Sequence, residues 1–322
     1  MTARDGKTLL REMIRIRVAE ETVGRHYPEQ EMRTPTHFSI GQEAISVGVC
    51  QALEPTDAAF SGHRCHAEYL AKGGSLLGMF AELYGRVDGC CKGRGGSVHL
   101  NAPDVGLVAS SAILGETIAT AVGAGWAFKM DGSDRLAVTF FGDGVTEEGI
   151  MHESVNFAAV KQVPVLFVCA NNGLSTNTPL HVRQPKGHEI WKWAAGYGVK
   201  AEHVDGSDVF AVHEAAQRAV AHIRAGNGPY FIEAPYFRAR VHVGFETDEM
   251  KNYVFRSKAD VDAGAALDPV EKAARRLIAE GVCTQADVDE WTAAMERELE
   301  DVVATAKASP FPAVEELLVG TY

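Results

Sequence analysis

The amino-acid sequence predicts an α/β fold, a parallel sheet with helices on both faces. Two apolar runs of strand length, residues 136–141 and 163–170, are separated by a helical stretch at 147–160. Parallel strands require a crossover of this kind, and a strand, helix and strand together take about 30 residues. The alternation continues to residue 236, so we expect one sheet whose ligands lie at the carboxyl ends of the strands.

The first 60 residues are predicted to form a helical arm. Apolar residues recur at helical spacing in 9–21 and again in 41–53, and Pro55 then stops the second helix. Residues 85–110 are rich in glycine and carry basic side chains, which favours a flexible cationic loop over a regular element.

The central part of the chain alternates helices with strands. The helices are expected at 113–129, 147–160, 189–196 and 208–225, and the strands at 136–141, 163–170, 199–204 and 229–236. We therefore divide the chain into a helical arm at 1–60, an α/β domain at 61–268 and a helical extension at 269–322. Two loops, 172–188 and 238–262, are longer than usual connections, which favours a functional role for them.

The extension is predicted to contain two amphipathic helices, at 269–280 and 284–307. Val288, Trp291 and Leu299 recur at helical spacing on the second of them. Such a stripe is typical of a packing face, either against this chain or against a partner.

Composition excludes several classes of partner and location. The 322 residues carry a formal net charge of −12 and no basic cluster, which argues against nucleic acid and against anionic membranes. The six cysteines show no paired spacing, so they are expected to be reduced thiols. The N-terminal segment lacks the apolar core of a signal peptide, and the longest apolar stretch, 112–128, is interrupted by Glu116. We therefore expect a cytoplasmic protein.

One motif points to chemistry. Asp143 lies between two glycines directly after the strand at 136–141, and Asn172 follows the next strand. Mg²⁺ takes six oxygen ligands, shared among carboxylates, neutral oxygens, water and substrate phosphates. Gly144 removes a Cβ where a bulky anion must approach the backbone, and the N-terminus of the following helix attracts phosphate. Gly-Asp-Gly alone is also a common turn, but with the asparagine at the neighbouring strand end it predicts a divalent cation that carries a diphosphate.

The surrounding sequence resembles a known family. From about residue 15 to residue 269 it is similar to the alpha subunit of the decarboxylating first component of 2-oxo acid dehydrogenase complexes, which include pyruvate, branched-chain and acetoin dehydrogenases. The motifs that carry the resemblance occur in the same order and include Gly41-Gln42-Glu43-Ala44, Pro55-Thr56-Asp57, His63-Arg64-Cys65-His66, Gly89-Cys90-Cys91-Lys92-Gly93-Arg94-Gly95-Gly96-Ser97-Val98-His99, Gly142-Asp143-Gly144 and Val204-Asp205-Gly206. The fold it implies is the diphosphate-binding half of a thiamin diphosphate-binding protein.

The resemblance also implies the cofactors and the residues that hold them. The cofactors are thiamin diphosphate and Mg²⁺, and the metal ligands are Asp143, Asn172 and the backbone carbonyl of Leu174. The remaining cofactor-binding positions are His63, which replaces a family tyrosine, Arg64, Gly144 and Val145 around the diphosphate, and Gly106 and Val108, whose backbone faces the aminopyrimidine ring.

His242 is the residue that the resemblance assigns to catalysis. In the family a loop with histidines follows the last core strand and assists acyl transfer. The corresponding segment of this chain, residues 236–244, contains a single histidine. The alignment can start from Arg238 or from Arg240, and in both registers a family histidine falls at His242.

Partners and function follow from the same resemblance. The sequence contains one sheet, so the activating glutamate is expected on a beta subunit in an α₂β₂ assembly, with a lipoyl-bearing acyltransferase as the acceptor. The leading function is decarboxylation of a 2-oxo acid or cleavage of acetoin, with transfer of the acyl group to the lipoyl carrier. Two alternatives stay open here, a non-redox thiamin carboligase or transketolase-like half-enzyme and a non-catalytic structural subunit.

Overall fold

The computed structural model describes residues 3–316, and it confirms the predicted fold class. Six parallel strands form one sheet in the order β2-β1-β3-β4-β8-β7. The strands are β1 (Ala58–Ser61), β2 (Leu107–Ser110), β3 (Ala137–Gly142), β4 (Val165–Asn171), β7 (Lys200–His203) and β8 (Tyr230–Pro235), with a separate hairpin of β5 (Leu174–Ser175) and β6 (Thr178–Pro179).

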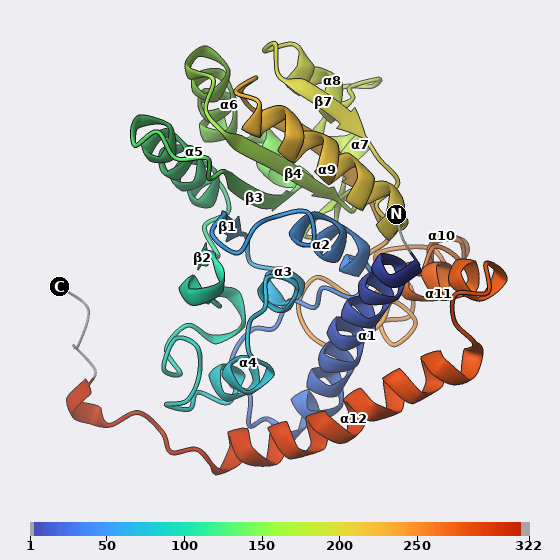
Figure 1. Ribbon diagram of the computed structural model, residues 1–322. Coiled ribbons are helices and arrows are strands. Elements are labelled where there is room, and N and C mark those ends of the chain that lie inside the picture. The colour runs from blue at the N-terminus through green and yellow to red at the C-terminus, as the bar shows by residue number, and fades with distance from the viewer. Residues whose placement is uncertain (1–2, 317–322) are drawn as a thin grey trace.

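Helices cover both faces of the sheet (Figure 1). They are α1 (Ala3–His26), α2 (Glu43–Cys50), α3 (His66–Ala71), α4 (Leu76–Leu83), α5 (Glu116–Met130), α6 (Gly149–Lys161), α7 (Leu180–Arg183), α8 (Ile190–Ala195), α9 (Val209–Arg224), α10 (Lys258–Ala265), α11 (Pro269–Ala279) and α12 (Gln285–Ala308). Helices α2 and α9 lie on one face, whereas α5, α6 and α8 lie on the other.

The strands are buried on both sides, which explains their continuous apolar sequence. In β4, Leu166 and Val168 pack into the core beneath α2 and α9, whereas Val165 and Phe167 pack into the core beneath α5 and α6. Alternate side chains of a strand point to opposite faces, so a strand covered on both faces is apolar throughout.

The N-terminal helices and the C-terminal extension pack on the same core as the sheet. Helix α12 crosses α1 and α4 (Figure 1), and its residues Leu299 and Val303 are buried. Trp291 is half-buried against the same core. The stripe predicted on the extension is therefore a packing face within this chain.

Several elements that position the site differ from the sequence prediction. Strands β1 and β2 were expected as parts of a helical arm and of a loop, because each is only four residues long. The helix predicted from residue 147 begins at Gly149, since a 3-10 turn at Asp143–Glu147 comes first. Among the described residues, no helix is long and apolar enough to cross a membrane.

Candidate functional site

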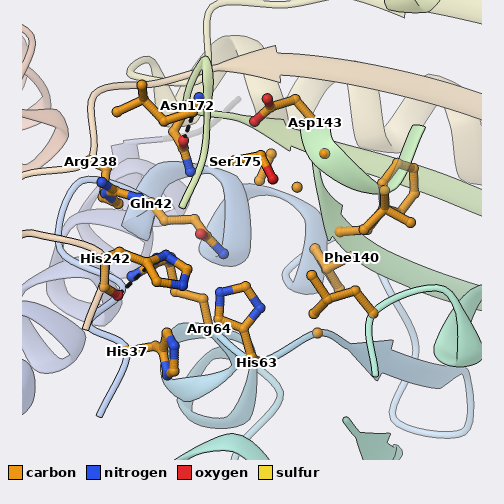
Figure 2. A pocket seen from close by; sticks show the side chains of 18 of the residues that line it. His37, Gln42, His63, Arg64, Phe140, Asp143, Asn172, Ser175, Arg238 and His242 are labelled. Atoms are coloured by element: carbon orange, nitrogen blue, oxygen red, sulfur yellow. Dashed lines mark hydrogen bonds between the residues drawn. The ribbon is translucent and has the colours of Figure 1, made fainter. Parts of the chain in front are cut away.

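A cavity of about 300 Å³ lies at the carboxyl ends of β1, β3, β4 and β8 (Figure 2). Strand β1 has β2 as its neighbour on one side and β3 on the other. The chain therefore adds its next strands on opposite sides of β1, and the strand order reverses there. Open α/β sheets bind ligands at such a switch point. The cavity brings together eight of the residues predicted from the sequence, namely His63, Arg64, Asp143, Gly144, Val145, Asn172, Leu174 and His242.

The structure does not bring Gly106 and Val108 to this cavity. Gly106 directly precedes β2, which runs parallel to β1 and ends at Ser110. It therefore lies at the edge of the sheet where the strands begin, opposite the cavity. Val108 lies on the edge strand and is 43% exposed. Their contact with a pyrimidine ring stays a prediction, and it concerns an outer surface of this chain.

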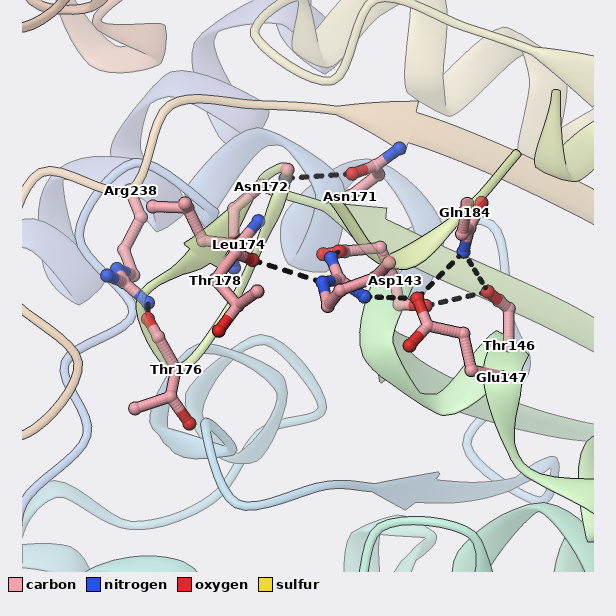
Figure 3. Close-up of polar contacts among 12 residues, drawn as sticks. Asp143, Thr146, Glu147, Asn171, Asn172, Leu174, Thr176, Thr178, Gln184 and Arg238 are labelled. Carbon is pink, nitrogen blue, oxygen red and sulfur yellow. Dashed lines mark hydrogen bonds and ion pairs between the residues drawn. The ribbon is translucent and has the colours of Figure 1, made fainter. Parts of the chain in front are cut away.

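One end of the cavity is acidic. Asp143 follows β3, is 1% exposed, and has one carboxylate oxygen, Oδ1, without a hydrogen-bond partner. Its other oxygen pairs with Arg183 of α7, which also binds Glu147 (Figure 3). Burial raises the pKa of Asp143 above its usual value, and Arg183 only partly opposes this. A buried carboxylate oxygen without a donor is suited to a cation.

Asn172 and the β5–β6 hairpin complete this end (Figure 3). The Asn172 side-chain oxygen accepts from the backbone N–H of Leu174 at 3.0 Å, and its amide group donates to the Tyr236 hydroxyl at 3.3 Å. A Cβ at Gly144 would lie 2.8 Å from the Ser175 hydroxyl oxygen, so a larger residue there would displace the Ser175 side chain. The hairpin thus places neutral oxygens beside the Asp143 carboxylate.

The other end of the cavity is cationic because two arginines are buried there without acidic partners. Arg64 is 8% exposed and donates to the carbonyls of Phe38 at 2.6 Å and His242 at 3.4 Å. Arg238, 2% exposed, donates only to backbone carbonyls of Arg240 and Thr176. Within the described residues, neither guanidinium forms an ion pair.

Burial lowers the pKa of Arg64, and burial together with the charge of Arg64 lowers the pKa of Arg238 to about 10. A buried charge without a counter-charge is strongly unfavourable. The pair is therefore suited to bind an anion.

Three histidines line the same end, with ring centroids 4.5–5.5 Å apart (Figure 2). Each has a buried ring nitrogen without a partner: Nδ1 of His37, Nε2 of His63 and Nδ1 of His242. Burial, followed by the charge of Arg64, lowers their pKa values to about 3, 2 and 4 in the same order. They are neutral at physiological pH, and a neutral imidazole can donate one hydrogen bond to an anion.

Sequence reasoning missed several residues of this site. His37 precedes the Gly41-Gln42 motif and reaches the cavity because Arg64 holds the carbonyl of the next residue, Phe38. Gln42 was noted only as part of that motif; its side-chain oxygen accepts from Tyr236 at 3.0 Å. In the sequence analysis, Arg238 was named only as a possible anchor for aligning the loop that carries His242. No local pattern distinguishes such residues, since the folded loops alone bring them together.

Comparison with known proteins places most of the chain within one protein family. The sequence pattern of the family described as "Dehydrogenase E1 component" matches residues 11–315. The chain is 33% identical to the alpha subunit of the acetoin:2,6-dichlorophenolindophenol oxidoreductase of Bacillus subtilis, over 98% of this chain and 92% of that protein.

Two further relatives are alpha subunits of pyruvate dehydrogenase E1 components. The chain is 34% identical to that of Rhizobium meliloti, over 95% of this chain and 87% of the relative. It is 33% identical to the chloroplastic alpha-3 subunit of Arabidopsis thaliana, over 100% of this chain and 75% of the relative. The similarity thus spans nearly the whole chain.

Proposed function

The chain belongs to the dehydrogenase E1 component family, and we propose that it is the alpha subunit of an enzyme that decarboxylates a 2-oxo acid or cleaves acetoin and passes the acyl group to a lipoyl carrier. Membership implies the use of thiamin diphosphate and a beta-subunit partner. Mg²⁺, the individual site residues and the α₂β₂ stoichiometry are parts of the proposal. A cytoplasmic location stays a prediction from the sequence, since the relatives include a chloroplastic protein.

The charge distribution of the cavity is the observation that carries this proposal. Two buried guanidiniums without acidic partners lie at one end, and a carboxylate with an unpartnered oxygen lies at the other. A diphosphate with a divalent cation complements both ends at once, because its anionic oxygens satisfy the arginines and its metal satisfies the carboxylate. A neutral ligand would leave both guanidiniums without a counter-charge and one Asp143 oxygen without a partner.

We assign the cation to Asp143, Asn172 and the backbone carbonyl of Leu174. When the metal binds, the Asp143 carboxylate releases Arg183 and coordinates the metal instead. Arg183 keeps its ion pair with Glu147. Gly144 and Val145 line the cavity directly after this carboxylate and hold the diphosphate by their backbone. Only the family likeness supports the role of the Leu174 carbonyl.

We assign the diphosphate to Arg64, Arg238 and the three histidines. Arginine suits this task because its planar fork matches two phosphate oxygens. Each neutral histidine has a ring nitrogen without a hydrogen-bond partner, and we assign these nitrogens to hydrogen bonds with the diphosphate. His63 in place of a tyrosine keeps a donor at its position.

Thiamin diphosphate supplies the nucleophilic carbon that attacks the substrate carbonyl. This chain binds the diphosphate end, fixes its orientation and excludes water from it. His242 is the residue we assign to acyl transfer. It is half-buried in the wall of the cavity, and its backbone carbonyl accepts from Arg64, so the loop that carries it is tied to the diphosphate end.

The proposal is tested by reconstituting the chain with its beta subunit and measuring reduction of dichlorophenolindophenol with pyruvate, branched-chain 2-oxo acids and acetoin. We expect turnover with one of these substrates, dependent on thiamin diphosphate and Mg²⁺. Arg64→Gln should weaken cofactor binding at least tenfold, since one charge-assisted hydrogen bond contributes about 1.5–3 kcal/mol. Arg275→Gln, at an exposed position, is the matched control.

Two results would contradict the proposal. Carbon–carbon ligation of aldehydes without any reduction of the dye would indicate a carboligase. No thermal shift with thiamin diphosphate and Mg²⁺, for the chain alone and for the reconstituted pair, would indicate a structural subunit.

A further inference from the structure

The glycine-rich segment 85–100 is folded around one buried carboxylate. Glu82 of α4 is 1% exposed and accepts from four backbone N–H groups. The donors are Cys91 at 2.8 Å, Gly93 at 2.9 Å, Gly95 at 2.6 Å and Gly96 at 3.0 Å. Adjacent N–H groups that converge on one anion form a rigid nest. The segment lies within residues 85–110, which were predicted to form a flexible cationic loop, and it consists mainly of turns.

This turn presents two adjacent cysteines. Their sulfur atoms, Cys90 Sγ and Cys91 Sγ, are 3.9 Å apart, and both residues are half-buried. We propose that Cys90 and Cys91 form a binding site for a soft, thiophilic cation of the Zn²⁺ or Cd²⁺ class. This site is separate from the cavity described above, and nothing in the proposed function requires it.

The distance between the sulfur atoms fits two ligands of one tetrahedral ion. Zinc–sulfur bonds are about 2.3 Å long, so two of them at the tetrahedral angle separate the sulfur atoms by about 3.8 Å. The observed 3.9 Å requires almost no movement of either side chain. A disulfide between the two is less favourable, because adjacent Cα atoms are about 3.8 Å apart and unstrained disulfides need about 4.4–6.8 Å.

Hydrogen bonds hold the two thiols in the ligand-free chain. Cys91 Sγ donates to the backbone carbonyl of His99 at 2.9 Å, and the two sulfurs are hydrogen-bonded to each other. Metal binding displaces a proton from each thiol. The thiolate is the form that binds soft metals.

Glu82 lies close enough to be a third ligand, but both of its oxygens already accept backbone hydrogen bonds. The protein therefore supplies two thiolates, and water or a small anion supplies the rest of the coordination. Such a two-ligand site exchanges its metal readily, unlike a closed structural site with four protein ligands.

The other four cysteines do not offer such a site. Cys50, Cys65 and Cys169 are buried singly, and burial raises the pKa of each thiol. Cys283 is also buried, and no second cysteine of the described chain lies beside it. The three histidines of the cavity also lie within metal-binding reach of one another. They are a poor cation site because Arg64 and Arg238 place two positive charges beside them.

A metal here would act on the cavity through Ser97. The Ser97 hydroxyl lies 2.8 Å from His66 Nε2, and its backbone carbonyl accepts from Cys65 Sγ at 3.3 Å. His66 and Cys65 directly follow the cavity residues His63 and Arg64. Coordination of an ion by Cys90 and Cys91 would therefore stiffen the turn that contains Ser97. This turn supports the cationic end of the cavity.

The experiment uses the full chain, freed of metal and titrated with Cd²⁺. We expect one equivalent to bind with a sulfur-to-cadmium charge-transfer absorption, to which histidine and carboxylate ligands contribute nothing. Cys90→Ser and Cys91→Ser should each weaken this binding at least tenfold and remove most of the absorption. Cys283→Ser is the matched control and should leave both unchanged. Trypsin cleavage after Lys92 and Arg94 should also slow when Cd²⁺ is bound.

Phenylarsine oxide tests the same site on the unaltered chain, which matters should either variant fail to fold. Each arsenic atom bonds two thiol sulfurs and releases one water, without any oxidation or reduction. Peptide mapping should find one arsenic bridging Cys90 and Cys91. The proposal is overturned if the absorption of the wild-type chain is absent or persists in both variants, or if the arsenic is found only on other cysteines.

Discussion

Asp143 illustrates how a single residue serves binding at the expense of stability. Its carboxylate is buried, one oxygen has no partner, and its pKa is raised mainly by burial. The folded chain therefore carries a charge that its surroundings stabilise incompletely. Functional sites commonly contain such groups, because the ligand supplies the missing interaction.

We predict that Asp143→Asn weakens binding of the cofactor but leaves the stability of the ligand-free chain almost unchanged. The free energy of unfolding without ligand should stay within about 1 kcal/mol of the wild type, because the change removes a poorly solvated charge and Arg183 retains Glu147. Affinity for thiamin diphosphate with Mg²⁺ should fall at least 100-fold, about 2.7 kcal/mol. Urea unfolding measures the first quantity and calorimetric titration the second. A variant that binds the cofactor with unchanged Mg²⁺ dependence would refute the metal assignment.

The three histidines predict how stability depends on pH. In the unfolded chain their pKa values are about 6.5, and in the folded chain they are about 3, 2 and 4 for His37, His63 and His242. Below pH 6.5 the unfolded state therefore binds more protons than the folded state, so stability falls as the pH falls. Each fully neutral histidine contributes a slope of up to about 1.4 kcal/mol per pH unit.

We expect the melting temperature of the ligand-free chain to drop steeply between pH 6.5 and pH 4.5. His63→Phe should make the drop shallower, whereas His188→Gln, at an exposed position, should not change it. Added pyrophosphate with Mg²⁺ should reduce the drop, since an anion favours protonated histidines. Identical pH profiles for the wild type and His63→Phe would show that His63 is not held neutral by burial.

Residue-scale sequence reasoning succeeded where a residue follows a strand. The residues predicted after β1, β3 and β4 all reach the cavity because parallel strands end at one edge of the sheet. It failed where the side chain comes from a loop that folds back from far away, as for His37 and Arg238. Gly106, which was predicted to face the aminopyrimidine ring, lies at the opposite edge of the sheet because it precedes β2; its contact with the ring stays a prediction.

At the scale of elements, the alternating part of the chain was predicted well and the part before it was not. The long helices α9 and α12 and the strands β3, β4 and β8 lie within about two residues of their predicted bounds. The short elements β7 and α8 were also predicted, whereas β1, β2, α3 and α4, which are of similar length, were missed. Their positions depend on tertiary contacts such as the pairing of β1 with β3, which no local pattern encodes.

The turn around Glu82 gives a prediction at this scale. Glu82→Gln replaces one acceptor oxygen by an N–H₂ group that faces backbone donors, so at least one buried N–H loses its partner. We expect a loss of about 2–4 kcal/mol in the free energy of unfolding. Faster trypsin cleavage after Lys92 should accompany it. Glu271→Gln, at an exposed position on α11, is the control and should change neither.

At the scale of the whole molecule, the described residues contain one six-stranded sheet with one cavity at the carboxyl ends of its strands. The cavity contains the groups suited to a metal diphosphate. The two residues assigned to the aminopyrimidine ring lie away from the cavity, and Val108 is exposed on the edge strand. We propose that the beta subunit completes the site on the pyrimidine side.

This leads to a prediction about assembly. The chain alone should bind thiamin diphosphate with Mg²⁺ weakly and show no turnover, because the diphosphate contacts are present and the groups that activate the ring are not. Addition of the beta subunit should restore turnover and tighten cofactor binding at least tenfold. The same coupling requires that the cofactor tighten association of the two subunits by an equal factor. Analytical ultracentrifugation with and without cofactor, beside calorimetric titration of each state, measures both factors. Equal cofactor affinity with and without the beta subunit, or turnover by the isolated chain, would show that this sheet contains a complete site.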